Sequence, residues 1–185
     1  MSSVPPFAFF GPHDLTDEVA LTVEQDLRDG LPVFEDMFVK KGWITRAEAD
    51  EGYIKGVFRG DRVRIAGPAA IRVITTDNEA EWQATRVIDD TYNFNIDCLA
   101  KVGNQTDEIE RFINTFGLLV RNYLRRFSNL QPAIDGTTGP IRAYNSWPGK
   151  VVTGYAQGGV YRVARIPYWI RVMNPVVFRP IGPGC

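Results

Sequence analysis

The sequence predicts an α/β fold of the α+β type, in which a mostly antiparallel sheet packs against one long amphipathic helix and a shorter N-terminal helix. Three observations predict it: alternation of apolar and mostly polar residues over 91–102, an apolar stripe at helical spacing over 106–127, and two late β-rich segments joined by a Gly-Gly turn. With 185 residues, of which 44% are hydrophobic, the chain is long enough to bury one core. We expect a single domain over 15–173, an N-terminal arm over 1–14 and a C-terminal arm over 174–185.

The first helix is predicted to begin at Thr16 and to end before Gly30. Thr16 is a good N-cap residue, and the apolar residues that follow it repeat every four positions, at Val19, Val23 and Leu27. From Leu31 to Gly60 the pattern is mixed. The one element expected there is a short helix over 45–51, with glycine turns around it.

Strands are expected from residue 62 onward. The apolar β-branched residues form two short runs, one at Val63 and Ile65 and one over 71–74, and the second run is bounded by Asp77-Asn78. The clearest strand covers 91–102, where the even-numbered residues from Tyr92 to Val102 are apolar and most of the odd-numbered ones are polar. This alternation predicts that one face of the strand is buried and the other meets water.

The longest predicted helix follows the turn Gly103-Asn104-Gln105 and covers 106–127. Thr106 is placed to cap it, and acidic residues in its first turn suit the positive end of the helix dipole. A continuous apolar stripe runs along it, comprising Ile109, Phe112, Ile113, Phe116, Val120, Tyr123, Leu124 and Phe127. This stripe is expected to cover the sheet.

The remainder of the chain is predicted to be a loop, a hairpin and an arm. Residues 128–150 are rich in Gly, Pro, Asn and Thr and predict a long loop. Two strands, over 151–155 and 160–173, are joined by Gln157-Gly158-Gly159. Pro167 predicts an edge or a bulge in the second strand, since proline lacks a backbone donor.

Charge is divided along the chain, although the net charge is only -1. Residues 1–110 hold 11 Lys/Arg against 21 Asp/Glu, a net of -10, whereas 111–185 hold 10 against 1, a net of +9. The basic half suits an acidic partner, which is either nucleic acid or the acidic half of a neighbouring copy in a head-to-tail ring. Alternatively, the two halves neutralise each other within one folded chain.

No residue set in the sequence supports catalysis, a metal site or a cofactor. His13 is the only histidine, and Cys98 and Cys185 are too few for a zinc site or a disulfide framework. Cys98 falls on the apolar side of its strand and is expected to be inert, and the acidic residues at 77, 79, 81, 89 and 90 are expected to be solvated. No phosphate loop, membrane span or signal peptide is recognisable, so we expect no catalytic residues, no cofactor, no membrane contact and a cytoplasmic chain.

The residues expected to make intermolecular contacts are aromatic, basic or thiol side chains on the arms, the long helix and the loop. Aromatic residues and arginines are enriched where proteins bind one another, and the two arginines on the helix could instead meet phosphates. A terminal cysteine could form an intermolecular disulfide or remain free. The candidates are Phe7, Phe9, Phe10, Arg121, Arg125, Trp147, Phe178, Arg179 and Cys185.

The order of these elements, with the strand Tyr92-Asn93-Phe94-Asn95-Ile96-Asp97-Cys98 and the amphipathic helix over 106–127, resembles the small neck proteins of tailed bacteriophages. The most similar type is the tail terminator. The resemblance covers about residues 15–175 and implies a structural virion subunit, made in the host cytoplasm, that forms a ring, commonly a hexamer. Such a ring terminates the tail tube and joins it to the head, so the implied partners are other copies, tail-tube and head-connector proteins, and DNA passing through the lumen without sequence-specific contact. Another neck role (head-tail connector, sheath-end or collar protein), a small enzyme and a DNA-binding protein remain alternatives.

Overall fold

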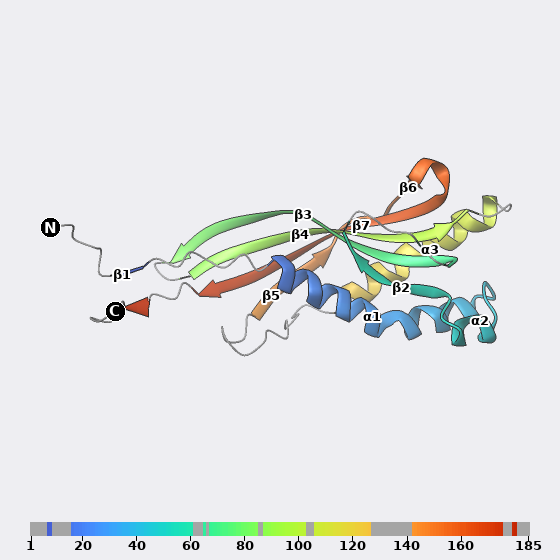
Figure 1. Cartoon of the computed structure of the whole chain (residues 1–185), viewed down its shortest axis with the longest axis horizontal. Coiled ribbons are helices and arrows are strands. Elements are labelled where there is room, and N and C mark those ends of the chain that lie inside the picture. Colours follow the sequence, from blue (N-terminus) through green and yellow to red (C-terminus); the bar gives the residue numbers. More distant parts are fainter. Residues whose placement is uncertain are drawn as a thin grey trace.

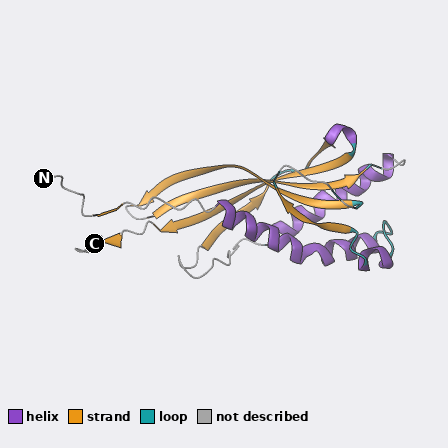
Figure 2. Ribbon diagram, in the orientation of Figure 1, coloured by secondary structure: helices purple, strands orange, loops and turns teal. Residues whose placement is uncertain are grey.

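The computed structural model describes residues 7–8, 16–60, 65, 67–84, 87–102, 106–126, 142–175 and 179–180. Its core is an open, largely antiparallel six-stranded sheet with two long helices packed on one face (Figures 1 and 2). The predicted fold class is therefore confirmed. The relative lengths of the helices are reversed, however, because the N-terminal helix has 25 residues and the second long helix has 19.

The sheet has the order β2-β3-β4-β7-β5, and β6 also pairs with β7. The strands are β2 (Ile54–Arg59), β3 (Ala69–Ala84), β4 (Val87–Lys101), β5 (Arg142–Pro148), β6 (Val152–Ala156) and β7 (Tyr161–Pro175). Only β2 runs parallel to its neighbour, β3. The strands β5 and β6 lie end to end along one side of β7, since β6 pairs with residues 161–165 and β5 with residues 168–173.

Helix α1 (Thr16–Lys40) continues past Gly30 and Pro32, so the predicted end before Gly30 is wrong. Gly30 marks a close approach instead, because a Cβ placed there would lie 2.7 Å from the ring of Tyr123. Pro32 is exposed, and it removes one backbone hydrogen bond from the helix. Burial of Phe34 and Phe38 beyond the proline offsets that loss, which is why tertiary packing carries the helix onward.

The short helix predicted over 45–51 is confirmed as α2 (Arg46–Asp50). Its capping box is complete: the amide of Glu48 donates to the Thr45 hydroxyl at 3.2 Å, and the Thr45 amide donates to the Glu48 carboxylate at 2.7 Å. Strand β2, which follows α2, was not predicted. Gly56 within it has a φ of 131°, and the strand register shifts there, so no period-2 pattern is visible in the sequence.

Strands β3 and β4 form a hairpin longer than predicted. The strand expected over 91–102 is confirmed as part of β4, and the run over 71–74 lies in β3. The expected boundary at Asp77-Asn78 is wrong, because β3 continues to Ala84 after a register shift between Thr75 and Asn78. Ile65 lies outside any strand, and Val63 lies outside the described residues.

The polar face of β4 is not wet throughout. Asp97 is 0% exposed and Leu99 is 3% exposed, which corrects the expectation that this whole face meets water. Leu99 packs with Tyr161 and Val163 in a second, smaller apolar cluster on this face. The sheet is therefore covered on both faces near this end, by helices on one side and by side chains from β2 and β7 on the other.

The amphipathic helix is confirmed as α3 (Thr106–Leu124), which ends three residues before the predicted end. Its predicted stripe is buried at Phe112, Ile113, Phe116, Val120 and Leu124. Phe116 lies edge-on to Phe38 with ring centroids 5.2 Å apart, which joins α3 to α1 through aromatic contacts above the sheet.

The predicted long loop contains strand β5, so residues 142–148 are corrected from loop to strand. The predicted hairpin is confirmed as β6 and β7, and its turn uses Gly158 and Gly159 at positive φ values of 64° and 91°. Pro167 lies inside β7, at the gap between β6 and β5. Its carbonyl accepts a 2.6 Å hydrogen bond from Gly149, so its missing donor faces that gap rather than β4.

The two arms meet each other where the structure describes them. Strand β1 (Phe7–Ala8) pairs antiparallel with β8 (Arg179–Pro180), and both lie at one end of the molecule (Figure 1). Asn174 and Pro175 belong to β7, which corrects the predicted start of the C-terminal arm. The turn at 103–105, most of the predicted loop and the remaining arm residues lie outside the described residues.

Candidate assembly surface

The exposed apolar side chains gather along the β5–β6 side of the sheet. Among the described residues, seven large hydrophobic side chains are exposed, and four of them fall between positions 147 and 160. These four are Trp147 at 38%, Val152 at 58%, Tyr155 at 57% and Val160 at 47% exposure. Exposed apolar side chains that gather along one side of a sheet are typical of a protein–protein contact rather than of a free surface.

Strand β6 forms an open edge of the sheet, since it pairs with β7 alone in the described chain. Its sequence, Val-Thr-Gly-Tyr-Ala, contains no charged residue and no proline. Charged residues and prolines usually prevent an edge strand from pairing with another chain, and β6 has neither.

The position of β6 is fixed from both of its ends. At the hairpin end, the Arg162 guanidinium lies 4.1 Å from the centre of the Tyr155 ring and also pairs with Glu110 on α3 at 2.6 Å. Before the strand, the Gly149 carbonyl accepts a 2.7 Å hydrogen bond from Nε of Arg121 on α3. The Arg162 contact supports the Tyr155 ring while leaving it exposed, which reduces the side-chain entropy lost when a partner binds.

Trp147 is supported in a similar way at the end of β5. Its ring stacks on that of Trp169 with a centroid distance of 6.1 Å and an interplanar angle of 14°. A Cβ at Gly149 would lie 2.8 Å from the Trp169 ring, so glycine is required for this approach. The Trp pair therefore presents a flat aromatic surface at the point where β5 gives way to β6.

A row of ionic contacts centred on the buried Asp97 crosses the sheet on the face away from the helices. Asp97 lies opposite Arg72 of β3 and Arg165 of β7 in the strand register. Its carboxylate accepts from Arg72 at 2.6 Å and from Arg165 at 2.7 and 2.9 Å. Two arginines on one buried carboxylate fix the register of three strands.

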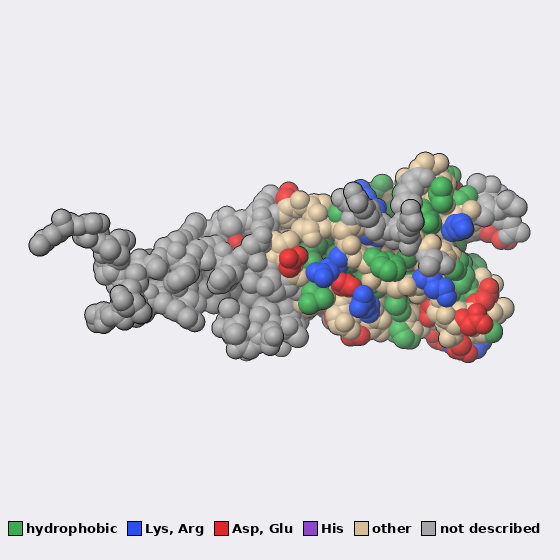
Figure 3. All heavy atoms as spheres, in the orientation of Figure 1, with side chains coloured by type: hydrophobic (Ala, Val, Ile, Leu, Met, Phe, Trp, Pro, Cys, Tyr) green, Lys and Arg blue, Asp and Glu red, His purple; other side chains and the backbone are tan. Residues whose placement is uncertain are grey.

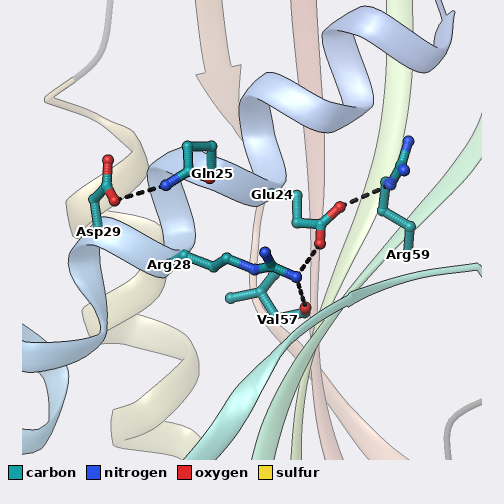
Figure 4. A network of polar contacts seen from close by, with 6 residues as sticks. All are labelled: Glu24, Gln25, Arg28, Asp29, Val57 and Arg59. Carbon is teal, nitrogen blue, oxygen red and sulfur yellow. Dashed lines mark hydrogen bonds and ion pairs between the residues drawn. The ribbon is translucent and has the colours of Figure 1, made fainter.

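A second polar network fixes β2 against α1 (Figure 4). Glu24 lies between two arginines, with Arg28 at 2.5 Å and Arg59 at 2.7 Å. Arg28 also donates to the carbonyl of Val57 at 3.3 Å. Because Arg59 is the last residue of β2, this network holds the point at which β2 stops covering the edge of β3.

Ion pairs within the chain join part of the basic half of the sequence to the acidic half. Arg162 and Arg165 from the basic half pair with Glu110 and Asp97 from the acidic half, as expected if the two halves neutralise each other. Four other basic residues are exposed and pair with no described carboxylate: Arg111, Arg125, Arg126 and Lys150. Acidic side chains gather over α2 at one end of the molecule (Figure 3), where Glu48, Asp50 and Glu51 are exposed.

The predicted contact residues fall in different places. Phe7 and Arg179 come together in the β1–β8 pair, and Trp147 lies on the β5–β6 side, near the Gly149 carbonyl that Arg121 holds. Arg125 is exposed in the turn after α3. The other four candidates lie outside the described residues: Phe9, Phe10, Phe178 and Cys185.

Sequence reasoning missed Val152, Tyr155 and Val160 as contact residues. It assigned the segment to a strand and its turn correctly, but apolar residues in a strand ordinarily indicate burial. The one available signal was the lack of charge over 151–161 in a half of the chain that is otherwise basic.

Burial shifts the pKa of two side chains among the described residues. Burial raises the pKa of the Cys98 thiol well above its usual value, which keeps it protonated and unreactive. Burial, aided by Asp29, raises the pKa of Asp26 to about 6. No group of three His, Cys, Asp or Glu side chains in this part of the chain is placed to hold a metal ion. None of the described helices is long and apolar enough to cross a membrane.

Comparison with known proteins identifies no family. No protein-family model and no curated protein matches the sequence. Among solved structures, a chain from a structure described as the virion of a native gene transfer agent particle superposes with a TM-score of 0.48 at 10% identity, covering 87% of this chain and 98% of that one. Another solved structure has a TM-score of 0.41 at 15% identity, covering 84% and 94%.

Proposed function

We propose that this chain is a non-enzymatic structural subunit that assembles with copies of itself. The observation that carries the proposal is the open β6 edge with its exposed Tyr155 and Val152. A folded chain gains little from exposing these side chains, whereas a subunit buries them when it assembles.

The assembly we propose is a ring at the neck of a bacteriophage virion. This proposal rests on the resemblance of the element order to tail terminators, together with a sheet whose two open edges suit a head-to-tail contact. The ring, a hexamer in the simplest case, would terminate the tail tube, join it to the head connector and assemble in the host cytoplasm. Residues 1–14 and 174–185 would then contact neighbouring rings, with Phe9, Phe10, Phe178 and Cys185 as candidate contacts. A head-tail connector, sheath-end or collar role is the alternative within the same class.

The mass of the species in solution tests the proposal. We expect light scattering coupled to size-exclusion chromatography to give a multiple of the 20.8 kDa chain mass, and electron microscopy to show a closed ring with one rotational symmetry. A chain that remains monomeric at every concentration, alone and with a purified tail tube, would contradict the self-assembly proposed here.

A second candidate function is non-specific DNA binding, favoured by the exposed Arg111, Arg125, Arg126 and Lys150. Phosphate contacts through such residues release counterions, so the affinity for DNA would fall steeply as salt rises. A monomer that binds duplex DNA in this salt-dependent manner would favour this function over the ring.

A further inference from the structure

We infer that β6 of one copy pairs with the outer half of β3, residues 74–84, of the next copy, so that the sheet continues from subunit to subunit. The inference rests on the proposed self-assembly and names the surface that performs it. The partner that binds the β6 edge is therefore a second copy of this chain.

The two sides of the sheet each leave an edge open. On one side, β6 pairs with β7 and with no other described strand. On the other side, β2 covers β3 as far as the Arg59–Val73 pair, and beyond it β3 pairs only with β4 among the described residues. Figure 1 shows this outer half of β3 reaching past the helices toward the end where β1 and β8 lie. Each open edge presents backbone donors and acceptors that a second strand can satisfy.

The apolar content of β6 makes it the edge that gains most from being covered. Val152 and Arg165 are register partners, and so are Tyr155 and Arg162, so Val152 and Tyr155 point to opposite faces of the sheet. A strand added beside β6 would therefore cover apolar surface on both faces. The register of an added strand is more strongly specified when apolar side chains are buried on both of its faces than when they are buried on one.

Charge decides which strand fits. Lys150, two residues before β6, is exposed and pairs with no described carboxylate, and residues 150–162 contain no acid, whereas residues 74–84 contain Asp77, Glu79 and Glu81 and no base. Pairing β3 with β3 would bring two acidic segments together, and pairing β6 with another β6 would leave Lys150 of each copy without an acidic partner. Pairing β6 with β3 brings opposite charges together and favours the head-to-tail contact. Since the two edges lie on opposite sides of one sheet, the contact repeats and closes into a ring when the rotation between copies permits.

Substitution of the edge tests the contact directly. In the β6 variant, Val152→Lys with Tyr155→Lys, the added charges should raise the protein concentration for half-assembly at least tenfold. The matched control is Leu21→Lys with Leu118→Lys, because Leu21 is 52% and Leu118 is 47% exposed, on α1 and α3. The control should assemble like the unmodified chain, and circular dichroism should show both variants folded. A β6 variant that assembles as well as the control would overturn the inference.

Mixing two variants tests the direction of the contact. The β3 variant carries Asp77→Lys, Glu79→Lys and Glu81→Lys, and should not form rings alone. An equimolar mixture of the β3 and β6 variants retains one intact contact for each pair of chains, an unmodified β6 against an unmodified β3. The mixture should therefore give a 1:1 dimer and no ring. Two variants that stay monomeric when mixed would show that β6 does not meet β3.

Hydrogen exchange on the unmodified chain keeps the inference falsifiable if a variant fails to fold. The amides of residues 74–84 and 152–156 should gain protection at concentrations where rings form, relative to dilute protein. Unchanged exchange at either edge in a chain that does assemble would refute the β6-to-β3 contact and leave the proposed function intact. A chain that never assembles would instead refute the proposed function itself.

Discussion

Replacement of Phe116 with alanine should destabilise the chain by about 4 kcal/mol, because the ring is the centre of the aromatic layer between the two long helices. Phe116 is 0% exposed. Its ring centroid lies 5.2 Å from that of Phe38, 5.9 Å from that of Phe112 and 6.5 Å from that of Phe34. A buried Phe→Ala change costs roughly 3–5 kcal/mol in general. The middle to upper part of that range applies here, since three rings lose an aromatic neighbour worth about 0.5–1.5 kcal/mol each.

Urea unfolding followed by circular dichroism measures this cost at one fixed protein concentration, which is needed because assembly adds to apparent stability. The midpoint should fall while the slope with urea stays constant, and the melting temperature should drop by roughly 8–16 °C for a chain of this size. Leu118→Ala is the control on the same helix, where the side chain is 47% exposed and the expected cost is within about 0.5 kcal/mol. If Phe116→Ala cost less than about 1 kcal/mol, the buried face of α3 would be wrongly assigned.

Three further perturbations follow from other parts of the structure. Asp97→Ala should cost about 3–5 kcal/mol in the free energy of unfolding, because it removes the carboxylate shared by Arg72 and Arg165; a loss no larger than that of an exposed Asp→Ala change would show that the ionic row contributes nothing. Gly117→Ala should destabilise by about 1–3 kcal/mol, although alanine is the better helix former, since its Cβ would lie 2.7 Å from that of Ala164; thermal melting should give a lower midpoint, and a higher one would refute the close packing of α3 on β7. Asp26 has a folded-state pKa of about 6 against an ordinary 3.8, so the folded chain favours the protonated form and stability is lost as pH rises from about 4 through 6. Asp26→Asn should remove that part of the pH dependence and raise stability above pH 6. Identical pH profiles of unfolding for the two chains would show that Asp26 does not contribute to the pH dependence.

Local patterns determined the elements whose signals lie within a few residues of one another. The stripe that ends near Leu124 follows from helical periodicity, and the alternation around Ile96 follows from strand geometry. The cap at Thr45 needs only Glu48, three residues away. These elements could be predicted because their geometry repeats along the chain itself.

Local patterns were wrong where a distant part of the chain overrides them. Gly30 and Pro32 are ordinary helix stops, yet α1 continues because Phe34 and Phe38 beyond them are buried against α3. The segment over 142–148 has the composition of a loop, yet it becomes a strand because β7 offers it an edge. In both places the deciding interaction joins residues that the sequence separates widely.

For the candidate assembly surface, the sequence determined that a hairpin surrounds Gly158 and that Trp147 is suited to contacts. Only the tertiary structure decided that β6 is an open edge and that Tyr155 is exposed on it. Strand order and exposure depend on which pairings and packings bury the most apolar surface. That burial is summed over the whole chain and cannot be read from one segment. A pattern of residues specifies which faces are apolar, whereas the fold determines which of those faces are left for a partner.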